Sequence, residues 1–172
     1  MADYLEDISP RRLVLEHYDR EALPLRRYLL FLGVDTETAQ EVVQESFLKL
    51  HQHLLADGDR TNLRAWLYRV AHNLGRNAQT AFRATKTDSL PDVTFSGDLP
   101  SSAASIEDEL LAEERTTRMR DAIAQLTPAQ KDCILLRAQG FKYREIAGVL
   151  NLSVSTVGEN IQRGLQKLKE LL

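Results

Sequence analysis

The sequence predicts an all-α protein, built as two small helical domains joined by a flexible acidic linker, the C-terminal one a helix-turn-helix. Apolar residues recur at spacings of three and four through most of the chain, which is typical of amphipathic helices. The stretch TDSLPDVTFSGDLPSSAASIEDE, residues 87–109, lacks that period and is rich in Ser, Asp and Pro, as linkers are. We therefore expect a tail over 1–10, a first domain over 11–86, a linker over 87–112 and a second domain over 113–172.

The first domain should begin with a helical segment from about Arg11 to Leu32. Pro24 should either start a second helix there or kink the first one, because proline removes a backbone donor. Gly33 should end the segment, and Asp35 or Thr36 can cap the next helix. The stripe of that next helix that should be buried comprises Ala39, Val42, Val43, Phe47, Leu50 and Leu54.

A third helix should run from a cap at Thr61 to about Arg83. Residues 60–87 contain no acid but carry basic residues interleaved with aromatic ones. Basic side chains can pair with phosphates, and aromatic faces can stack on unpaired bases. The same pattern also fits an amphipathic helix with a basic solvated side and aromatic core residues, so composition leaves both interpretations open.

The second domain carries a helix-turn-helix pattern. Thr127, Pro128 and Gln130 form a capping box before one helix, and Gly140 stands where that helix should stop. The spacing that follows is typical of the motif: the small Ala147, then Asn151 for a left-handed turn, then the apolar Val157. An ordinary three-helix bundle is the alternative. The rest of the expected core of this domain is Ile146, Leu150, Leu152, Val154, Ile161 and Leu165.

The outer face of the last helix should read DNA if the motif binds it. Ser153 can cap this helix, Asn160 can bond adenine edges, and Arg163 can reach guanine or phosphate. Glu159 has two interpretations: it accepts from a cytosine amino group, or it lies over phosphate and weakens nonspecific binding. With so little positive charge this helix cannot bind DNA tightly alone.

Positive and negative charges are segregated along the chain, so the total charge alone does not show which partners the protein can bind. The net charge is −3, but residues 86–114 hold one lysine and eight acidic residues, whereas residues 115–172 hold ten basic and five acidic residues. An acidic total therefore does not exclude nucleic-acid binding by a local basic face. The apolar stretches are too short to span a bilayer, and the start of the chain lacks the apolar core of a secretory signal.

We expect no enzyme activity, no cofactor and no metal site. The sequence has no glycine-rich phosphate loop, and its four histidines and single cysteine, Cys133, show no metal-ligand spacing. A lone cysteine excludes an internal disulfide and fits a cytoplasmic protein.

Four segments, in this order, resemble the extracytoplasmic-function (ECF) group of bacterial sigma factors, the initiation subunits of RNA polymerase. They are AQEVVQESFLKL, AWLYRVAHNL, LTPAQKDCILLR and REIAGVLNLSVSTVGENIQRGLQKL. The resemblance covers roughly residues 11–85 and 115–172. It implies a first domain that binds core polymerase and the −10 element, and a second that reads the −35 element.

The resemblance assigns candidate residues to three surfaces. Those expected to bind core polymerase are Glu41, Gln44, Glu45 and Lys49. Those expected at the −10 element are Arg64, Arg69, His72, Asn73, Arg76, Asn77 and Arg83. Those expected at the −35 element are Lys142, Arg144, Ser153, Ser155, Thr156, Glu159, Asn160, Arg163 and Lys167.

Several positions depart from the family pattern and lower the basic charge at both DNA-facing helices. His72 replaces a common arginine, Thr80 stands near another arginine position, and Gly158-Glu159 replaces Lys-Ser, while Asn77 stands at an aspartate position. The implied partners are core RNA polymerase, promoter DNA and an anti-sigma factor. The acidic linker either lies near the RNA path of the polymerase or is a solvated spacer. Two rival functions remain: a sigma-like mimic that binds an anti-sigma regulator without promoter recognition, and a DNA-binding repressor that uses only the second domain. The sequence leaves open whether the two domains pack together.

Overall fold

The computed structural model describes residues 9–85 and 105–172, and this part of the chain folds into helices without a strand, which confirms the all-α fold class. The N-terminal domain contains α1 Pro10–Leu32, α2 Thr36–Leu55 and α3 Leu63–Thr85. The C-terminal domain contains α4 Ile106–Ala124, α5 Pro128–Ala138, α6 Tyr143–Leu150 and α7 Val154–Leu171. Within the described residues, no helix combines the length and the apolar content that a membrane span requires.

The linker expected over 87–112 is helical in its last part. Residues 87–104 of it, and residues 1–8 of the expected tail, lie outside the described residues, but α4 begins at Ile106. Ser105 and Asp108 form a capping box there, and Glu107 and Glu109 complete an acidic first turn. Negative charge near a helix N-terminus is favourable, so acids that suggest a linker by composition here stabilise a helix start.

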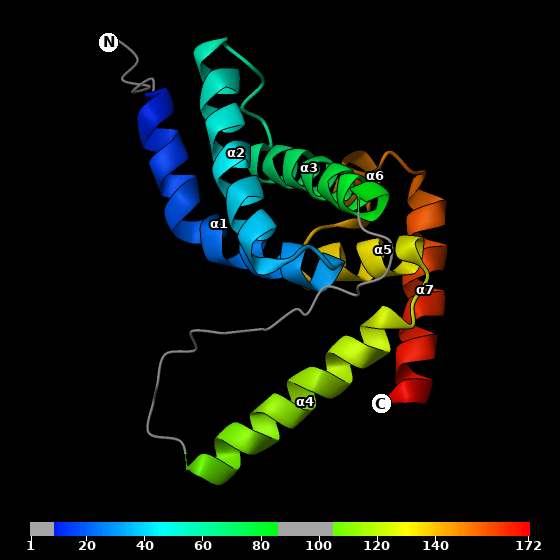
Figure 1. The fold of residues 1–172 in the computed structure, drawn as a ribbon. Coiled ribbons are helices and arrows are strands. Elements are labelled where there is room, and N and C mark those ends of the chain that lie inside the picture. The colour runs from blue at the N-terminus through cyan, green and yellow to red at the C-terminus, as the bar shows by residue number, and fades with distance from the viewer. Residues whose placement is uncertain (1–8, 86–104) are drawn as a thin grey trace, which may run out of the picture.

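The helix boundaries follow local rules in most places. Pro24 lies inside α1, which remains one helix and bends partway along its length (Figure 1). Asp35 caps α2, its Oδ1 accepting from the Thr38 backbone N–H at 2.9 Å. The cap expected at Thr61 is wrong, because Asn62 Oδ1 accepts from the Ala65 N–H at 3.1 Å while Thr61 donates to Asp59.

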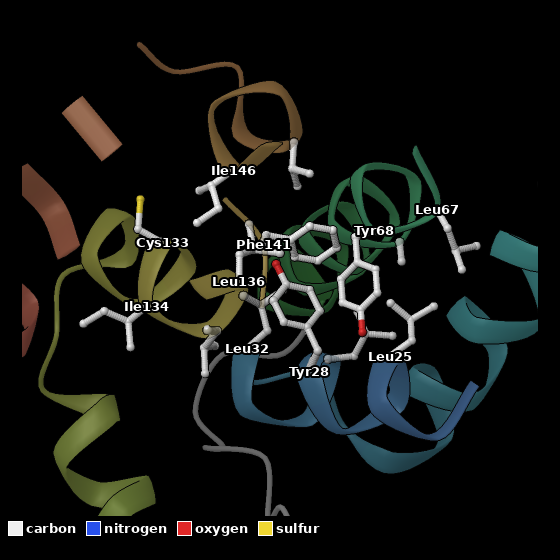
Figure 2. Close-up of a cluster of buried hydrophobic side chains, with 14 of the residues drawn as sticks. Leu25, Tyr28, Leu32, Leu67, Tyr68, Cys133, Ile134, Leu136, Phe141 and Ile146 are labelled. Atoms are coloured by element: carbon white, nitrogen blue, oxygen red, sulfur yellow. The ribbon is translucent and has the colours of Figure 1, made fainter. Parts of the chain in front are cut away.

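Both domains contribute to one continuous core. The buried stripe expected on α2 is confirmed, and α3 packs against α1 and α2 on one side and against α6 on the other (Figure 1). The aromatic rings of Tyr28, Tyr68 and Phe141 meet where the domains join (Figure 2). Tyr68 and Phe141 pack edge to face with centroids 4.9 Å apart. The domains are therefore closed on one another in this structure.

Two expected core residues of the last helix are exposed. Val154 is 45% exposed because it is the first residue of α7, and Leu165 is 54% exposed. The inward position is taken instead by Gly164, where an added Cβ would overlap the terminal methyl of Ile134 on α5. The glycine lets α7 and α5 approach closely, and Leu165 is consequently turned outward.

Candidate nucleic-acid interface

The helix-turn-helix consists of α6, a tight turn and α7. Asn151 ends α6 in the left-handed conformation, with φ at 54°, as the sequence predicts. Ser153 then caps α7, its Oγ accepting from the Thr156 N–H at 3.2 Å. On the inner face of α7, Val157 and Ile161 are buried. The opposite face of α7 is therefore turned toward solvent.

The solvent face of α7 carries the polar residues expected to read DNA. Ser155, Glu159, Arg163 and Lys167 are exposed, and Thr156 and Asn160 are half-buried. The Asn160 side-chain amide donates to the Thr156 carbonyl at 3.0 Å, so it must leave this bond before it can bond a base. Ser153, Lys142 and Arg144, at the starts of α7 and α6, are also exposed.

The Glu159 side chain makes only a weak ion pair within the chain. Its Oε2 lies 3.9 Å from Arg163 Nη2, and the two side chains are 66% and 72% exposed. An exposed pair four residues apart on a helix contributes about 0.3–0.5 kcal/mol. Glu159 therefore remains available to an external partner.

The exposed stripe of α2 holds the residues expected to bind polymerase. Glu41, Gln44 and Glu45 are exposed, and the half-buried Lys49 lies 3.5 Å from Glu45. Leu48, on the same stripe, is 51% exposed and was missed by the sequence analysis. The sequence does carry a signal for it, because Leu48 lies four residues after Gln44 and three after Glu45 and so falls on the polar face of the helix.

The residues expected at the −10 element fall into two groups on α3. Arg69, Asn73, Asn77 and Arg83 are exposed, as DNA-binding residues should be. The other three, Arg64, His72 and Arg76, contact other parts of the chain, and these contacts reach across to the C-terminal domain.

Arg76 and His72 meet Asp132 of α5 at the junction of the domains. Arg76 Nη2 donates to the Asp132 carboxylate, and His72 Nε2 lies 3.6 Å from the other carboxylate oxygen. On its far side His72 Nδ1 is hydrogen-bonded to the Tyr28 hydroxyl at 2.7 Å. His72 is only 7% exposed, and in the closed chain its two ring nitrogens face protein groups.

Burial sets the charge states in this cluster. Desolvation, with Arg76 nearby, lowers the pKa of His72 to about 4, so the imidazole is neutral at pH 7. Desolvation raises the pKa of Tyr28 well above its ordinary value, so its hydroxyl stays protonated. Burial also raises the pKa of Asp132, and the guanidinium of Arg76 opposes that rise. The ion pair with Arg76 therefore stabilises the ionised form of the buried Asp132 carboxylate.

Arg64 makes a second junction between the domains. Its Nε donates to Glu21 at 2.7 Å within the N-terminal domain, and its Nη2 donates to the Gln139 carbonyl at 2.7 Å. Its guanidinium carbon lies 4.2 Å from the centroid of the Phe141 ring, within cation–π range. The sequence did not indicate Gln139, Phe141 and Asp132 as partners of α3, because no local pattern indicates contacts such as these, 56 and 75 residues away.

A peripheral contact closes the rim of the same interface. The Asn62 amide donates to Glu145 Oε1 at 3.0 Å, while the other carboxylate oxygen of Glu145 accepts from the Lys142 N–H. The hydrogen bond from that backbone N–H is the largest of the effects that lower the pKa of Glu145. Among the residues described by the structure, no cluster of three or more histidine, cysteine or acidic side chains could hold a metal ion.

An exposed, capped reading helix in one domain and a basic helix in the other define a two-domain DNA-binding transcription factor. Residues 17–85 match the family described as Sigma-70 region 2, and residues 116–168 match Sigma-70, region 4. The chain belongs to the sigma-70 family of RNA polymerase sigma factors, in the ECF group. It therefore functions in promoter-directed transcription initiation, and members of this family are initiation factors rather than enzymes.

Curated relatives agree with this assignment over nearly the whole chain. The sigma factor SigZ of Bacillus subtilis is 30% identical over 158 residues, covering 90% of this chain and 84% of SigZ. The ECF sigma factor SigL of Mycobacterium tuberculosis is 30% identical, covering 88% of this chain and 84% of SigL.

Two solved structures share the fold. CnrH in complex with the cytosolic domain of CnrY has a TM-score of 0.67 at 24% identity, covering 94% of this chain and 88% of CnrH. RpoE in complex with the anti-sigma factor NepR from Bartonella quintana has a TM-score of 0.69 at 19% identity, covering 91% and 94% of the two chains.

Proposed function

We propose that this chain binds core RNA polymerase through the exposed stripe of α2 and reads the −35 element with α7. The observation that carries the proposal is the solvent face of α7, where Ser155, Glu159 and Arg163 are exposed on a helix capped by Ser153. Backbone N–H groups at that capped end favour a DNA phosphate. The polar side chains beyond it face a groove in which base edges offer donors and acceptors.

Polymerase supplies the affinity that α7 lacks. Glu41, Gln44, Glu45 and Lys49 form a polar surface around the exposed Leu48, and this mixture of an apolar centre and a polar rim suits a protein interface. Tethering both domains to polymerase makes two weak DNA contacts act together, with an effective concentration on the order of millimolar.

The −10 element would bind the exposed part of α3. Arg69 and Arg83 can neutralise phosphates, and Asn73 and Asn77 can bond unpaired bases. Arg64 and Arg76 would join them only after the domains separate. The proposed role of the acidic linker near the RNA path falls mostly on residues 87–104, which lie outside the described ones, because the remaining linker acids begin α4.

An anti-sigma factor is the proposed regulator of this chain, and the cytoplasm its compartment. CnrH and RpoE, which share its fold, were each solved with a bound partner, CnrY and NepR respectively. A protein that acts on RNA polymerase and DNA works where these molecules are.

Run-off transcription with core polymerase on a pool of genomic promoters tests the proposal. We expect transcripts from a small set of promoters that share −35 and −10 sequences. Polymerase binding without a transcript from any promoter would instead support the sigma-like mimic, and tight specific binding by residues 110–172 alone would support the repressor.

Glu159 allows a sharper test of −35 reading. Glu159→Lys should strengthen binding to random duplex DNA, raise the salt dependence by about one phosphate contact and relax the −35 preference. Glu159→Gln, which removes the charge without adding one, is the matched control. The measurement is selection of −35 sequences from a random library by the polymerase holoenzyme, and an unchanged preference in both variants would show that Glu159 contacts no base.

A further inference from the structure

Lys131 of α5 lies between the end of α1 and the second half of α3. A Cβ added at Gly33, which ends α1, would lie 3.8 Å from Lys131 Nζ and 2.9 Å from Gln79 Nε2 of α3. The ammonium group of the lysine and the amide of the glutamine therefore lie beside the same stretch of backbone. Side chains from two helices meet here at the end of a third.

The polar groups around Lys131 are already engaged with one another. Gln79 accepts from Arg76 Nη1 at 3.1 Å and donates to the Leu32 carbonyl at 3.1 Å. The Asp132 carboxylate accepts from Arg76 Nη2. Within residues 9–85 and 105–172, Lys131 itself makes no hydrogen bond and no ion pair, although it is half-buried. An ammonium group that loses water without gaining a partner is unfavourable.

Positive charge is in excess around this lysine. Burial and then Arg76 lower the pKa of Lys131, Asp132 opposes that shift, and Arg83 adds to it. Both arginines are therefore within electrostatic range of the lysine. In the described part of the chain, Asp132 is the one carboxylate that affects this pKa. Three cations against one carboxylate leave an excess of two positive charges.

A phosphate group with two negative charges fits this excess. Guanidinium groups bind phosphate oxygens through paired donors, and an ammonium group binds them as a compact charge. Arg83 is exposed, and Lys131 and Arg76 are half-buried, so all three side chains keep some access to solvent. A phosphodiester of DNA carries only one charge, which leaves half of the excess uncompensated.

We propose that Lys131, Arg76 and Arg83 form a site for a small phosphate-type dianion, either inorganic phosphate or a terminal phosphate monoester. The anion bridges the ammonium group to the two guanidinium groups and leaves the ion pair of Arg76 with Asp132 in place. Because its ligands come from α3 and α5, the anion binds the folded chain and stabilises it. The inference does not depend on the proposed function, since it concerns the folded chain without polymerase or promoter DNA.

Titration of the full chain with inorganic phosphate tests the site. The measurement is calorimetry above neutral pH, where phosphate is mostly a dianion, with chloride holding the ionic strength constant. We expect one saturable site with a dissociation constant of about 1 mM or below. Lys131→Gln and Arg83→Gln should each weaken binding at least about tenfold, because each removes a charge-assisted hydrogen bond.

The matched control is Lys169→Gln, which removes an exposed lysine from the last turn of α7 and should bind phosphate as the unmodified chain does. Arg83 is exposed, so its variant tests the site even if Lys131→Gln does not fold. Phosphate binding that does not saturate, or that all three variants weaken equally, would overturn the inference, because either result is what a diffuse ion atmosphere gives.

Two further probes distinguish the sources of the phosphate group. Adenosine monophosphate offers a monoester: tighter binding than inorganic phosphate assigns the site to a phosphate monoester, and weaker binding assigns it to inorganic phosphate. Oligothymidine without a terminal phosphate offers only diesters. If its binding alone depends on Lys131, while neither phosphate nor the nucleotide binds, the lysine is a DNA contact and the inference is overturned.

Thermal unfolding gives an independent readout. Without phosphate, Lys131→Gln should unfold at the same temperature as the unmodified chain or at a higher one, because the substitution removes like-charge repulsion. Phosphate should raise the midpoint of the unmodified chain and not that of the variant. An equal rise in both would overturn the inference.

Discussion

The Arg76–Asp132 ion pair should couple the stability of the two domains. The Asp132 side chain is 13% exposed, and the Arg76 side chain is 30% exposed. Removing one partner of a fully buried pair costs about 3–5 kcal/mol, because a charge is left without compensation. Arg76 can reach water when Asp132 is neutralised, so we expect Asp132→Asn to cost about 2 kcal/mol. Arg76→Met leaves the carboxylate in the interface and should cost about 3 kcal/mol.

The double variant should recover part of this loss. With both charges removed neither is stranded, so the coupling energy of the double-mutant cycle should be about 1–2 kcal/mol. The assay is urea unfolding, followed by helical circular dichroism and by the fluorescence of Trp66, the only tryptophan. Because Trp66 is on α3, its signal reports the N-terminal domain, whereas circular dichroism reports both domains.

The shape of these transitions is as informative as their midpoints. One continuous core predicts coincident transitions for the unmodified chain, and Asp132→Asn should separate them as the domains uncouple. Arg69→Met, on the exposed face of the same helix, is the matched control and should change stability by less than about 0.5 kcal/mol. A coupling energy below about 0.5 kcal/mol would refute the claim that the pair joins the domains.

Two further outcomes follow from the packing. The pKa of His72 is lowered from 6.5 to about 4, so the unfolded chain takes up a proton before the folded chain does, and stability should fall by about 3 kcal/mol as pH decreases from 6.5 to 4. His72→Asn should flatten that part of the profile in urea titrations at each pH, and an equally steep profile would assign the loss to other groups. Gly164→Ala forces an added methyl onto Ile134, whereas Gly148→Ala in α6 meets nothing within 4 Å. The first should therefore be about 1–3 kcal/mol less stable than the second in thermal unfolding, and equal stability would mean that α5 and α7 do not approach as closely as the structure has them.

Features set by neighbouring residues could be predicted from the sequence. The Asp35 cap, the capping box at Thr127, the left-handed Asn151 and the buried stripe of α2 depend on contacts within a turn or two of helix. Local rules failed where a small residue takes a core position. Gly164 has no apolar side chain to mark it, so Leu165 was expected to be buried in its place.

The contacts between the two domains, by contrast, could not be predicted from local sequence patterns. Asp132 lies in the well-capped helix α5, and nothing in the surrounding sequence indicates that it pairs with Arg76. An acidic residue is rarely buried without a partner, so the sequence does not predict that Asp132 is buried either. The acid-free span over residues 60–87 does indicate a surface that binds anions. It does not indicate which anion, because an arginine offers the same donors to a phosphate and to a carboxylate.

Asp132 and a DNA phosphate would compete for Arg76, and the outcome depends on which other contacts stabilise the closed interface. Closure buries Phe141 against Tyr68 and places Arg64 over its ring, and a DNA strand offers neither contact to the C-terminal domain. DNA must therefore be helped by a partner that separates the domains. Binding of α2 to polymerase and of α7 to −35 DNA, at a separation larger than the closed chain allows, would supply that help through binding energy, with no new contact at Arg76. On this argument, the proposed −10 contacts of α3 must be weak, because an α3 that bound DNA tightly alone would open the chain without polymerase.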